Sequence, residues 1–322
     1  MKNFKCKICG YPFNNIMIYT KEMNFGMGDE FEYFQCLKCG CVQIVNIPAD
    51  LEKFYPSYYG SLKKLIPTQF SFKRKIIERL LVKLHLQYIG HWNFLGFIIS
   101  FFKKNYRIWL NKSFNNLDSK ILDVGCGNGD LLFHLKKIGY KKLFGVDPYI
   151  STDININGVN IVKGYVSDLT DKYDIIMFHH SFEHIYEQKE TLSLVRELLN
   201  DNGFLLIRVP VSDSYAFRKY KNNWIGLDAP RHLFLHGTKS LNHLANKMGF
   251  VVGDILYDSD LYQFEVSEKY ERGMKLHTID EIFSAKEKAV LKKEAVRLNR
   301  IKDGDCACFF FTKTSKKTKF YN

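Results

Sequence analysis

The chain has 322 residues, of which 46% are hydrophobic and 15% are aromatic. This composition excludes an intrinsically disordered chain, and the length allows one sizeable hydrophobic core with a smaller module beside it. Lysine and arginine together exceed aspartate and glutamate by 13, which favours an anionic partner such as a nucleotide sugar, a phosphorylated glycan, nucleic acid or an acidic membrane face.

Residues 1–47 carry two CxxC pairs, CKICG and CLKCG. Four thiolates at this spacing predict a zinc ribbon that holds one structural Zn²⁺, since four sulfur ligands leave the ion no open position. A glycine follows each pair and can adopt the positive φ that turns backbone amides toward the sulfurs. Redox disulfides are the alternative, and Cys41 in CLKCGC could replace the last ligand. The predicted ligands are Cys6, Cys9, Cys36 and Cys39.

The first twenty residues contain no uninterrupted apolar segment, so we expect no secretion signal and a cytoplasmic protein. In that compartment a disulfide framework is disfavoured. This supports zinc over disulfides for the two CxxC pairs.

Residues 48–118 are predicted to form a helical linker or cap. The basic stretch SFKRKIIERLLVKLHL has apolar residues at helical spacing, and a second helix is predicted over 92–110. Packing on the next domain is the simpler interpretation of these helices, and peripheral contact with a membrane is the alternative. The apolar run at 86–102 is shorter than the about twenty residues needed to cross a bilayer, so we expect no transmembrane helix.

From residue 119 to 251 short apolar strands alternate with helices. Ile121–Val124 is a predicted strand, followed by a glycine-rich turn and an amphipathic helix, and a second strand, KLFGVD, ends at Asp147. Further strands are predicted at VNIVKG, YDIIMF and FLLIRVP. The alternation predicts an open parallel α/β sheet covered on both faces, with a ligand beyond the carboxyl ends of its strands.

Residues 252–322 are expected to complete this fold. The segments VVGDILY and CACFFFTK are the last two predicted strands, the final one inserted antiparallel, and a charged helix is predicted between them near IDEIFSAKEKAVLKKEAVRLNR. The cysteines of the final strand are expected to pack in the core.

The glycine-rich turn has the spacing GxGxG, formed by Gly125, Gly127 and Gly129. Asp130 stands where a dinucleotide-binding turn has a small residue, and a carboxylate there would repel a pyrophosphate. Asp123 before the turn and Asp147 after it suit a ligand with a cationic centre, an amino acid end and a ribose. These features predict S-adenosylmethionine as the ligand.

The segments ILDVGCGNG, GVDP, YDIIMFHHSFEHI and NGFLLIRVP together resemble a class I S-adenosylmethionine-dependent methyltransferase over roughly residues 119–251. The resemblance implies a Rossmann-like α/β sheet. It also implies that Asp123 and the three glycines hold the methionine end of the cofactor, and that Asp147 holds the ribose. Asp168 is the candidate near the adenine, and His179 and His180 would line the floor beneath the cofactor.

The flanking segments are similar to those of a bacterial subset of these enzymes. In that subset a zinc ribbon and a segment resembling NIPADLEKFYPSYY come first, and a loop resembling WIGLDAPRH follows the fifth strand. Many members of the subset belong to polysaccharide, sugar or secondary-metabolite pathways. The resemblance therefore implies a small-molecule or sugar substrate.

The segment HHSFEH also contains the metallopeptidase spacing H-x-x-E-H. Because it follows a predicted strand and does not lie within a long helix, we do not expect a peptidase. Glu183 and His184 could orient a substrate hydroxyl or bind a second, divalent metal. The alternative is that this pair only caps the helix that follows.

Methyl transfer to a hydroxyl requires removal of its proton, for which a histidine is a suitable base. His232 in DAPRH is the first candidate, and His184 and His180 are the others. Arg231 could grip a phosphate or carboxylate of the substrate. The structural alternative is that PRHLFLHG only begins the next helix.

The expected function is S-adenosylmethionine-dependent O-methylation of a sugar, glycan or other small molecule. An RNA base methyltransferase and a non-catalytic scaffold are the alternatives. The loop YPFNNIMIYTKEMNFGMGDEFEYFQ has a single basic residue, Lys21, against four acidic ones, so nucleic acid is the less favoured partner. The intact glycine turn and Asp147 argue against a scaffold.

Overall fold

The computed structural model describes residues 4–13, 15–56 and 116–314. The chain forms two compact units, each assembled from segments that are far apart in the sequence. The predicted helices and the apolar run between residues 57 and 115 lie outside the described residues. The first unit contains residues 1–56, 180–192 and 207–322, and the second contains residues 57–179 and 193–206.

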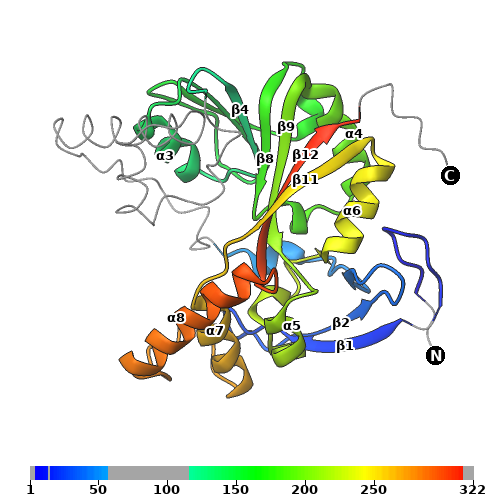
Figure 1. The fold of residues 1–322 in the computed structure, drawn as a ribbon, viewed down its shortest axis with the longest axis vertical. Coiled ribbons are helices and arrows are strands. Elements are labelled where there is room, and N and C mark those ends of the chain that lie inside the picture. Colours follow the sequence, from blue (N-terminus) through cyan, green and yellow to red (C-terminus); the bar gives the residue numbers. More distant parts are fainter. Residues whose placement is uncertain (1–3, 14, 57–115, 315–322) are drawn as a thin grey trace. The chain divides into compact units, whose positions relative to one another are not determined.

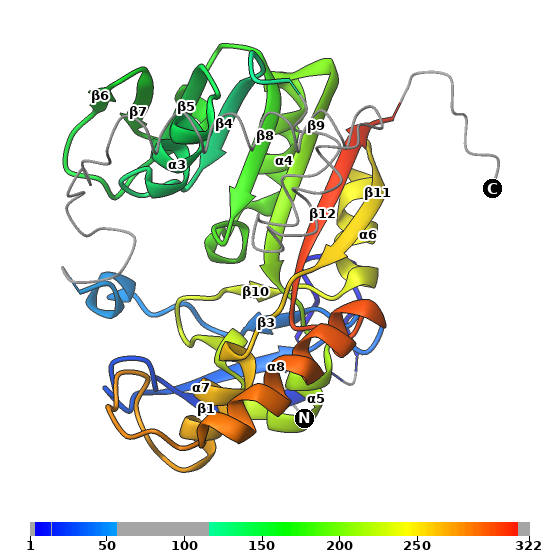
Figure 2. The ribbon, with the colours of Figure 1, turned by 60° about the vertical axis from the view of Figure 1, so that its left-hand side comes forward.

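A parallel sheet forms the centre of the second unit, and its strands are drawn in Figure 2. β4 (Lys120–Val124) pairs in parallel with β5 (Lys142–Asp147) and with β8 (Tyr173–His179). β5 pairs in parallel with β7 (Val159–Lys163), and the first part of β9 (Leu199–Pro210) lies beside β8. Consecutive buried residues in β4 and β8 are typical of strands covered on both faces. The five predicted strands are confirmed.

One edge of this sheet is a hairpin that the sequence analysis did not predict. β6 (Ile154–Ile156) pairs antiparallel with β7 through a turn at Asn157 and Gly158. Both turn residues have positive φ, 53° and 77°, as an Asn-Gly hairpin turn requires. The sheet is therefore antiparallel at this edge as well, which the sequence analysis did not predict.

In the first unit, the end of β9 continues beside the C-terminal strands. β12 (Cys306–Lys313) lies next to β9 and pairs antiparallel with β11 (Phe250–Tyr257). Phe309 and Phe311 of β12 are fully buried. The prediction that the final strand inserts antiparallel is confirmed.

The charged insertion between β11 and β12 forms helix α8 (Ala285–Arg300), as predicted. Ser284 and Glu287 cap its start reciprocally, which satisfies backbone amides that have no partner within the helix. An unpredicted helix precedes it, α7 (Tyr262–Glu271), and Figure 1 shows the two side by side. The other α-helices within the described residues are α3 (Asp130–Ile138), α4 (Gln188–Leu198), α5 (Tyr215–Tyr220) and α6 (Thr238–Lys247).

The N-terminal residues form a small antiparallel sheet in the first unit. β1 (Ile16–Lys21) pairs with β2 (Glu30–Gln35), and β2 pairs with β3 (Val42–Ile44). The fourth strand, β10 (Phe234–Leu235), comes from the segment after β9 and pairs antiparallel with β3. The sheet of the ribbon is therefore completed by residues from a distant part of the chain.

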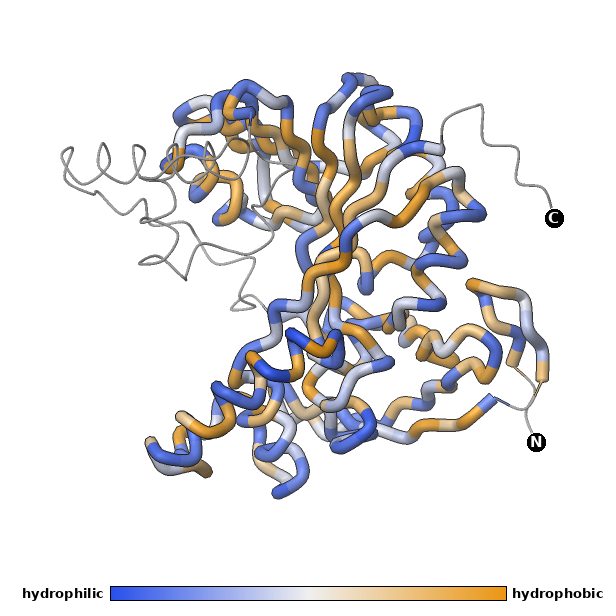
Figure 3. Tube along the Cα trace, in the orientation of Figure 1, coloured by the Kyte–Doolittle hydropathy of each residue, from blue (hydrophilic) through white to orange (hydrophobic). Residues whose placement is uncertain are grey.

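Hydrophobic residues follow the strands β8, β9 and β12, whereas hydrophilic residues alternate with hydrophobic ones along α8 (Figure 3). Among the helices of the described ranges, none combines the length and the hydropathy that crossing a membrane requires. The apolar side chains of β8, β9 and β12 contribute to the hydrophobic core.

Candidate functional site

The turn after β4 is shaped by its three glycines. Their φ angles are 73°, 54° and 84°, all in the left-handed region that favours glycine. A Cβ atom on the last of them would lie 2.3 Å from Cδ1 of Ile161, so the space beside this turn is also limited. The amides of the three glycines donate to the carbonyl oxygen of Val146, to Oδ2 of Asp147 and to the carbonyl oxygen of Cys126, which fixes the shape of the turn. The residues are Gly125, Gly127 and Gly129.

Two buried carboxylates flank this turn, as predicted. Asp147, at the end of β5, accepts hydrogen bonds from the backbone amides of Gly127 and Tyr149, both at 2.8 Å. Within the described chain, Oδ1 of Asp123 accepts no hydrogen bond. Burial, and then the charge of Asp147, raise the pKa of Asp123 well above its usual range. A cationic ligand would lower the pKa of Asp123 and favour its charged form. Asp123 and Asp147 therefore fit the amino and sulfonium charges of S-adenosylmethionine.

Two other predicted cofactor residues lie after β7 and at the end of β8. Asp168 is exposed after β7, and its Oδ2 accepts a hydrogen bond from the amide of Tyr165 at 2.8 Å. This bond caps the short helical turn Val166–Asp168. His179 is the half-buried last residue of β8.

The sulfurs of four cysteines converge in the ribbon. Sγ of Cys6 lies 3.6 Å from Sγ of Cys39, and Sγ of Cys9 lies 3.5 Å from Sγ of Cys36. Tetrahedral Zn–S bonds of about 2.3 Å place two sulfurs about 3.8 Å apart, so the quartet fits zinc. Cys41 lies outside this quartet, and its thiol faces the carbonyl of the next residue.

The surroundings favour the thiolate form at one sulfur of the quartet, that of Cys6, whereas burial raises the pKa of Cys9 and a hydrogen bond to Cys6 raises that of Cys39. The Cys39 thiol donates to the sulfur of Cys6 and lowers the pKa of Cys6 to about 5. Nε2 of Gln43 also donates to Cys6, at 2.9 Å. Gly10 and Gly40, which follow the two pairs, have φ of 75° and 79°, as predicted.

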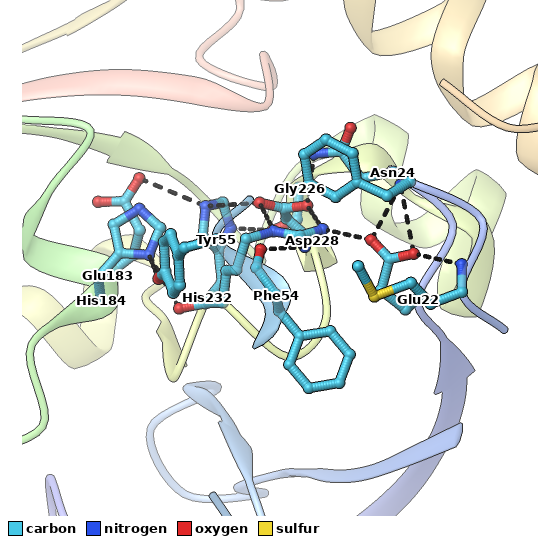
Figure 4. Close-up of polar contacts among 12 residues, drawn as sticks. Glu22, Asn24, Phe54, Tyr55, Glu183, His184, Gly226, Asp228 and His232 are labelled. Atoms are coloured by element: carbon cyan, nitrogen blue, oxygen red, sulfur yellow. Dashed lines mark hydrogen bonds and ion pairs between the residues drawn. The ribbon is translucent and has the colours of Figure 1, made fainter. Parts of the chain in front are cut away.

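A second polar cluster lies in the first unit, where Figure 4 shows its side chains. Glu183 and His184 belong to a short 3₁₀ turn after β8, and His232 lies between β9 and β10. One oxygen donor of Glu183 and one ring nitrogen of each histidine lie within 4.8 Å of one another. The Glu183 side chain is 1% exposed, and neither of its oxygens accepts a hydrogen bond from the described residues. We call Glu183, His184 and His232 the polar triad.

The hydrogen bonds of the two histidines determine which ring nitrogen carries a proton. Nδ1 of His184 lies 2.9 Å from the carbonyl oxygen of Arg231, and Nδ1 of His232 lies 2.7 Å from that of Gly226. A carbonyl oxygen only accepts, so each Nδ1 is the protonated nitrogen. In the neutral ring Nε2 then carries a lone pair. Nε2 of His232 is 3.8 Å from Oε1 of Glu183.

The charges in the triad follow from its surroundings. Burial raises the pKa of Glu183, but the approach of His180 and the charges of His232 and His184 together outweigh burial and lower it to about 2. Burial, and then the charge of His232, lower the pKa of His184. Near neutral pH Glu183 is therefore a carboxylate and His184 is a neutral imidazole.

His180 lies at the edge of the triad in a left-handed conformation, with φ of 57°. Its Nδ1 is 3.5 Å from Oε1 of Glu183, and its Nε2 contacts Nη1 of Arg208. Arg208 is itself paired with Asp258 at 2.8 Å. Since the guanidinium only donates, Nε2 of His180 acts as an acceptor toward Arg208.

The expectation that Arg231 grips a substrate was wrong. The side chain is fully buried, and its guanidinium binds Glu22 at 2.8 Å, Asp228 at 2.6 Å and the carbonyl oxygen of Phe54 at 3.0 Å. Its role is to join the loop after β9 to the ribbon. The sequence analysis missed this pair because Glu22 is separated from Arg231 by more than 200 residues and resembled an exposed acidic residue.

Residues 100–254 match the sequence profile of a family described as methyltransferase domain. The parallel strands and the GxGxG turn after β4 lie in this range. Over these residues the chain is similar to that family, and its fold is a Rossmann-like α/β methyltransferase fold with a mixed sheet.

The relatives found by sequence are methyltransferases as well. A human protein named EEF1A lysine methyltransferase 2 is 35% identical over 66 residues, which are 20% of this chain and 28% of that protein. An uncharacterized methyltransferase of Staphylococcus carnosus (strain TM300) is 26% identical over 132 residues, which are 37% of this chain and 62% of that protein. The chain thus spans less than two thirds of the length of either curated relative.

A solved S-adenosylmethionine-dependent methyltransferase from Archaeoglobus fulgidus is 22% identical. The superposition covers 76% of this chain and 100% of that chain, with a TM-score of 0.38.

Proposed function

We propose that the chain transfers a methyl group from S-adenosylmethionine to a hydroxyl oxygen of a sugar, glycan or other small molecule. The observation that carries the proposal is the polar triad, which combines a buried carboxylate with two imidazoles whose Nε2 atoms have lone pairs. The residues of the triad follow β8 and β9, and ligands of α/β sheets bind beyond the carboxyl ends of strands.

The proposed cofactor residues all belong to the second unit. The glycine turn and Asp123 would hold the methionine end, and Asp147 would accept hydrogen bonds from the ribose hydroxyls. Asp168 and His179 are the further candidates around the adenine and the cofactor floor. When bound, S-adenosylmethionine supplies a methyl group that is already activated by its sulfonium sulfur.

The protein must then place the acceptor hydroxyl and remove its proton. The lone pairs on Nε2 of His232 and of His184 can serve this step in two ways. They can accept the proton directly, or they can bind a cation that lowers the pKa of the hydroxyl. His180 contacts Arg208 through Nε2, so we propose that it orients Glu183 and is the weakest of the three candidates for the base.

The net positive charge of the chain supports an anionic substrate, such as a phosphorylated or nucleotide-linked sugar. RNA remains the alternative acceptor. A lysine side chain of a protein is a further candidate, because the human relative is named as a lysine methyltransferase. Glu22, one of the acidic residues of the ribbon, is fully buried, so the surface of the ribbon is less acidic than the sequence suggested. Electrostatics alone therefore discriminates less between RNA and sugar acceptors than expected.

Mass spectrometry of polysaccharide and nucleotide-sugar pools, with and without the gene, tests the proposal. We expect one product to lose the mass of a CH₂ unit when the gene is absent. The same measurement on ribosomal RNA and on cellular protein covers the other acceptors. A change confined to RNA or to protein would contradict the proposed acceptor class.

Alanine in place of Asp147 is expected to weaken S-adenosylmethionine binding by about 1–3 kcal/mol, through loss of the charge-assisted bonds to the ribose. Calorimetry with S-adenosylmethionine and S-adenosylhomocysteine measures the effect, with a one-to-one stoichiometry for the unmodified chain. Asp171→Ala, an exposed aspartate of the same unit, is the control and should bind normally. If Asp147→Ala bound S-adenosylmethionine as tightly as the unmodified chain, Asp147 would not be part of the cofactor site.

We further propose that the cysteine quartet holds one structural zinc. Serine in place of Cys9 is expected to release the ion and unfold the ribbon, while cofactor affinity stays largely intact because the proposed cofactor residues lie in the other unit. Metal analysis and limited proteolysis measure the two effects. Cys41→Ser is the matched control and should retain the zinc, because Cys41 is outside the quartet.

A further inference from the structure

We propose that the polar triad, Glu183, His184 and His232, binds one divalent ion of the zinc or iron class, which keeps a coordination position for the oxygen of the acceptor hydroxyl. The role of the ion in methyl transfer rests on the proposed function, whereas its binding does not.

The first observation is geometric. Two ligand atoms bonded to one ion at about 2.1 Å are at most about 4.2 Å apart. Nε2 of His232 and Oε1 of Glu183 already satisfy this limit, at 3.8 Å. The three donors, one atom from each residue, all lie within 4.8 Å of one another, so a closure of less than an ångström would bring every pair within this limit. The rings of His184 and His232 have centroids 4.8 Å apart and an interplanar angle of 65°, so they do not stack face to face.

The second observation is the orientation of the histidines. Metal-binding histidines commonly donate the ring N–H that faces away from the metal to a carbonyl or a carboxylate, which fixes the tautomer. Nδ1 of His184 donates in this way to the carbonyl oxygen of Arg231, and Nδ1 of His232 donates to that of Gly226. In its neutral form each ring then carries on Nε2 the lone pair that a metal requires.

The third observation is the buried charge. Glu183 and Glu22 are buried carboxylates, and the side chain of Asp228 is 10% exposed. The single guanidinium of Arg231 pairs with both Glu22 and Asp228, so it does not pair with Glu183. Buried charges are stable only when they are paired, and Glu183 has only imidazoles beside it, with His180 at 3.5 Å and His232 at 3.8 Å. A divalent ion would supply a full positive charge next to Glu183.

The donor set indicates the kind of ion. Imidazole nitrogen suits zinc, iron and copper, whereas magnesium and calcium prefer sites made of oxygen alone. Three protein ligands leave at least one position open, unlike the four sulfurs of the ribbon. A hydroxyl oxygen bound at the open position would lose its proton at a lower pH than in water.

The test uses the full chain and two measurements. Elemental analysis after saturation with zinc is expected to give two ions per chain. Titration with Co²⁺ then distinguishes the sites, because the cysteine quartet produces thiolate-to-metal charge-transfer absorption and the triad produces only weak ligand-field bands. The second site should bind at least about 100-fold more weakly in Glu183→Gln, which keeps the volume but removes the charged ligand.

Glu187→Gln is the matched control, since Glu187 is exposed four residues along the chain, and it should bind two ions. His232→Gln repeats the test if Glu183→Gln does not fold. One ion per chain at saturation, or unchanged affinity in a folded Glu183→Gln, would overturn the inference. Methyl transfer by a chain whose triad stays empty would overturn the role of the ion alone, whereas ion binding without any methylated product would contradict only the proposed function.

Discussion

Glutamine in place of His232 is expected to lower turnover by about 10²–10⁴-fold, with cofactor binding nearly unchanged. Glutamine has a similar polar volume, and its amide can still donate to the carbonyl oxygen of Gly226. It has no nitrogen lone pair at the place of Nε2, so it can neither accept the proton of a hydroxyl nor bind a metal strongly. Single-turnover kinetics together with calorimetry separate the chemical step from cofactor binding.

His243→Gln is the matched control, because His243 is exposed on α6 and should be replaceable without loss of turnover. The corresponding variants of His184 and His180 rank the three candidates, and we expect a smaller loss for His180. Full turnover in all three single variants would show that alignment of the substrates alone drives transfer, or that Glu183 or Asp228 removes the proton.

Methionine in place of Arg231 is expected to destabilise the first unit by about 3–5 kcal/mol, because removing one partner of a buried ion pair leaves uncompensated charge. Glu22 is fully buried and Asp228 is 10% exposed, so both carboxylates would lose their cation away from water. Glu22 also accepts backbone hydrogen bonds from Phe25 and Met27, which favours the lower end of this range. Urea unfolding followed by the fluorescence of the buried Trp224 measures the change.

A surface arginine supplies the comparison. Arg218 pairs with Asp303 at 2.7 Å but its side chain is 56% exposed, so Arg218→Met should cost less than about 1 kcal/mol. Adding Glu22→Gln to Arg231→Met should restore part of the lost stability, because one of the two unpaired charges disappears. Equal stability of the Arg231 and Arg218 variants would show that the buried network contributes little.

The strands of the main sheet were predictable because each is a short apolar run between turn residues. The hairpin β6–β7 was missed although Asn157-Gly158 is a strong turn signal, since Ile154–Ile156 is short and only partly buried. Helix α7 was missed because its buried residues include polar ones, Gln263 and Ser267, and so do not form a clear apolar stripe.

The candidate sites were predictable to different extents for a physical reason. Local spacing fixes the cysteine quartet and the glycine turn, and both lie as predicted. The polar triad combines residues nearly 50 positions apart, and sequence spacing contained no information on which nitrogen of His232 faces Glu183. The partner of Arg231 could not be found from the sequence, because the contact depends on how the ribbon packs against the loop after β9.

The pairing of β3 with β10, which lies far along the chain, has a consequence for synthesis of the protein. β3 directly follows the cysteine quartet, but the strand that pairs with β3 is synthesised roughly 190 residues later. At about 5–20 residues per second this interval is on the order of 10–40 seconds. During that time the edge of β3 has unpaired backbone groups and is open to pairing with another nascent chain. The ribbon therefore acquires its complete sheet only after roughly 190 further residues have been synthesised.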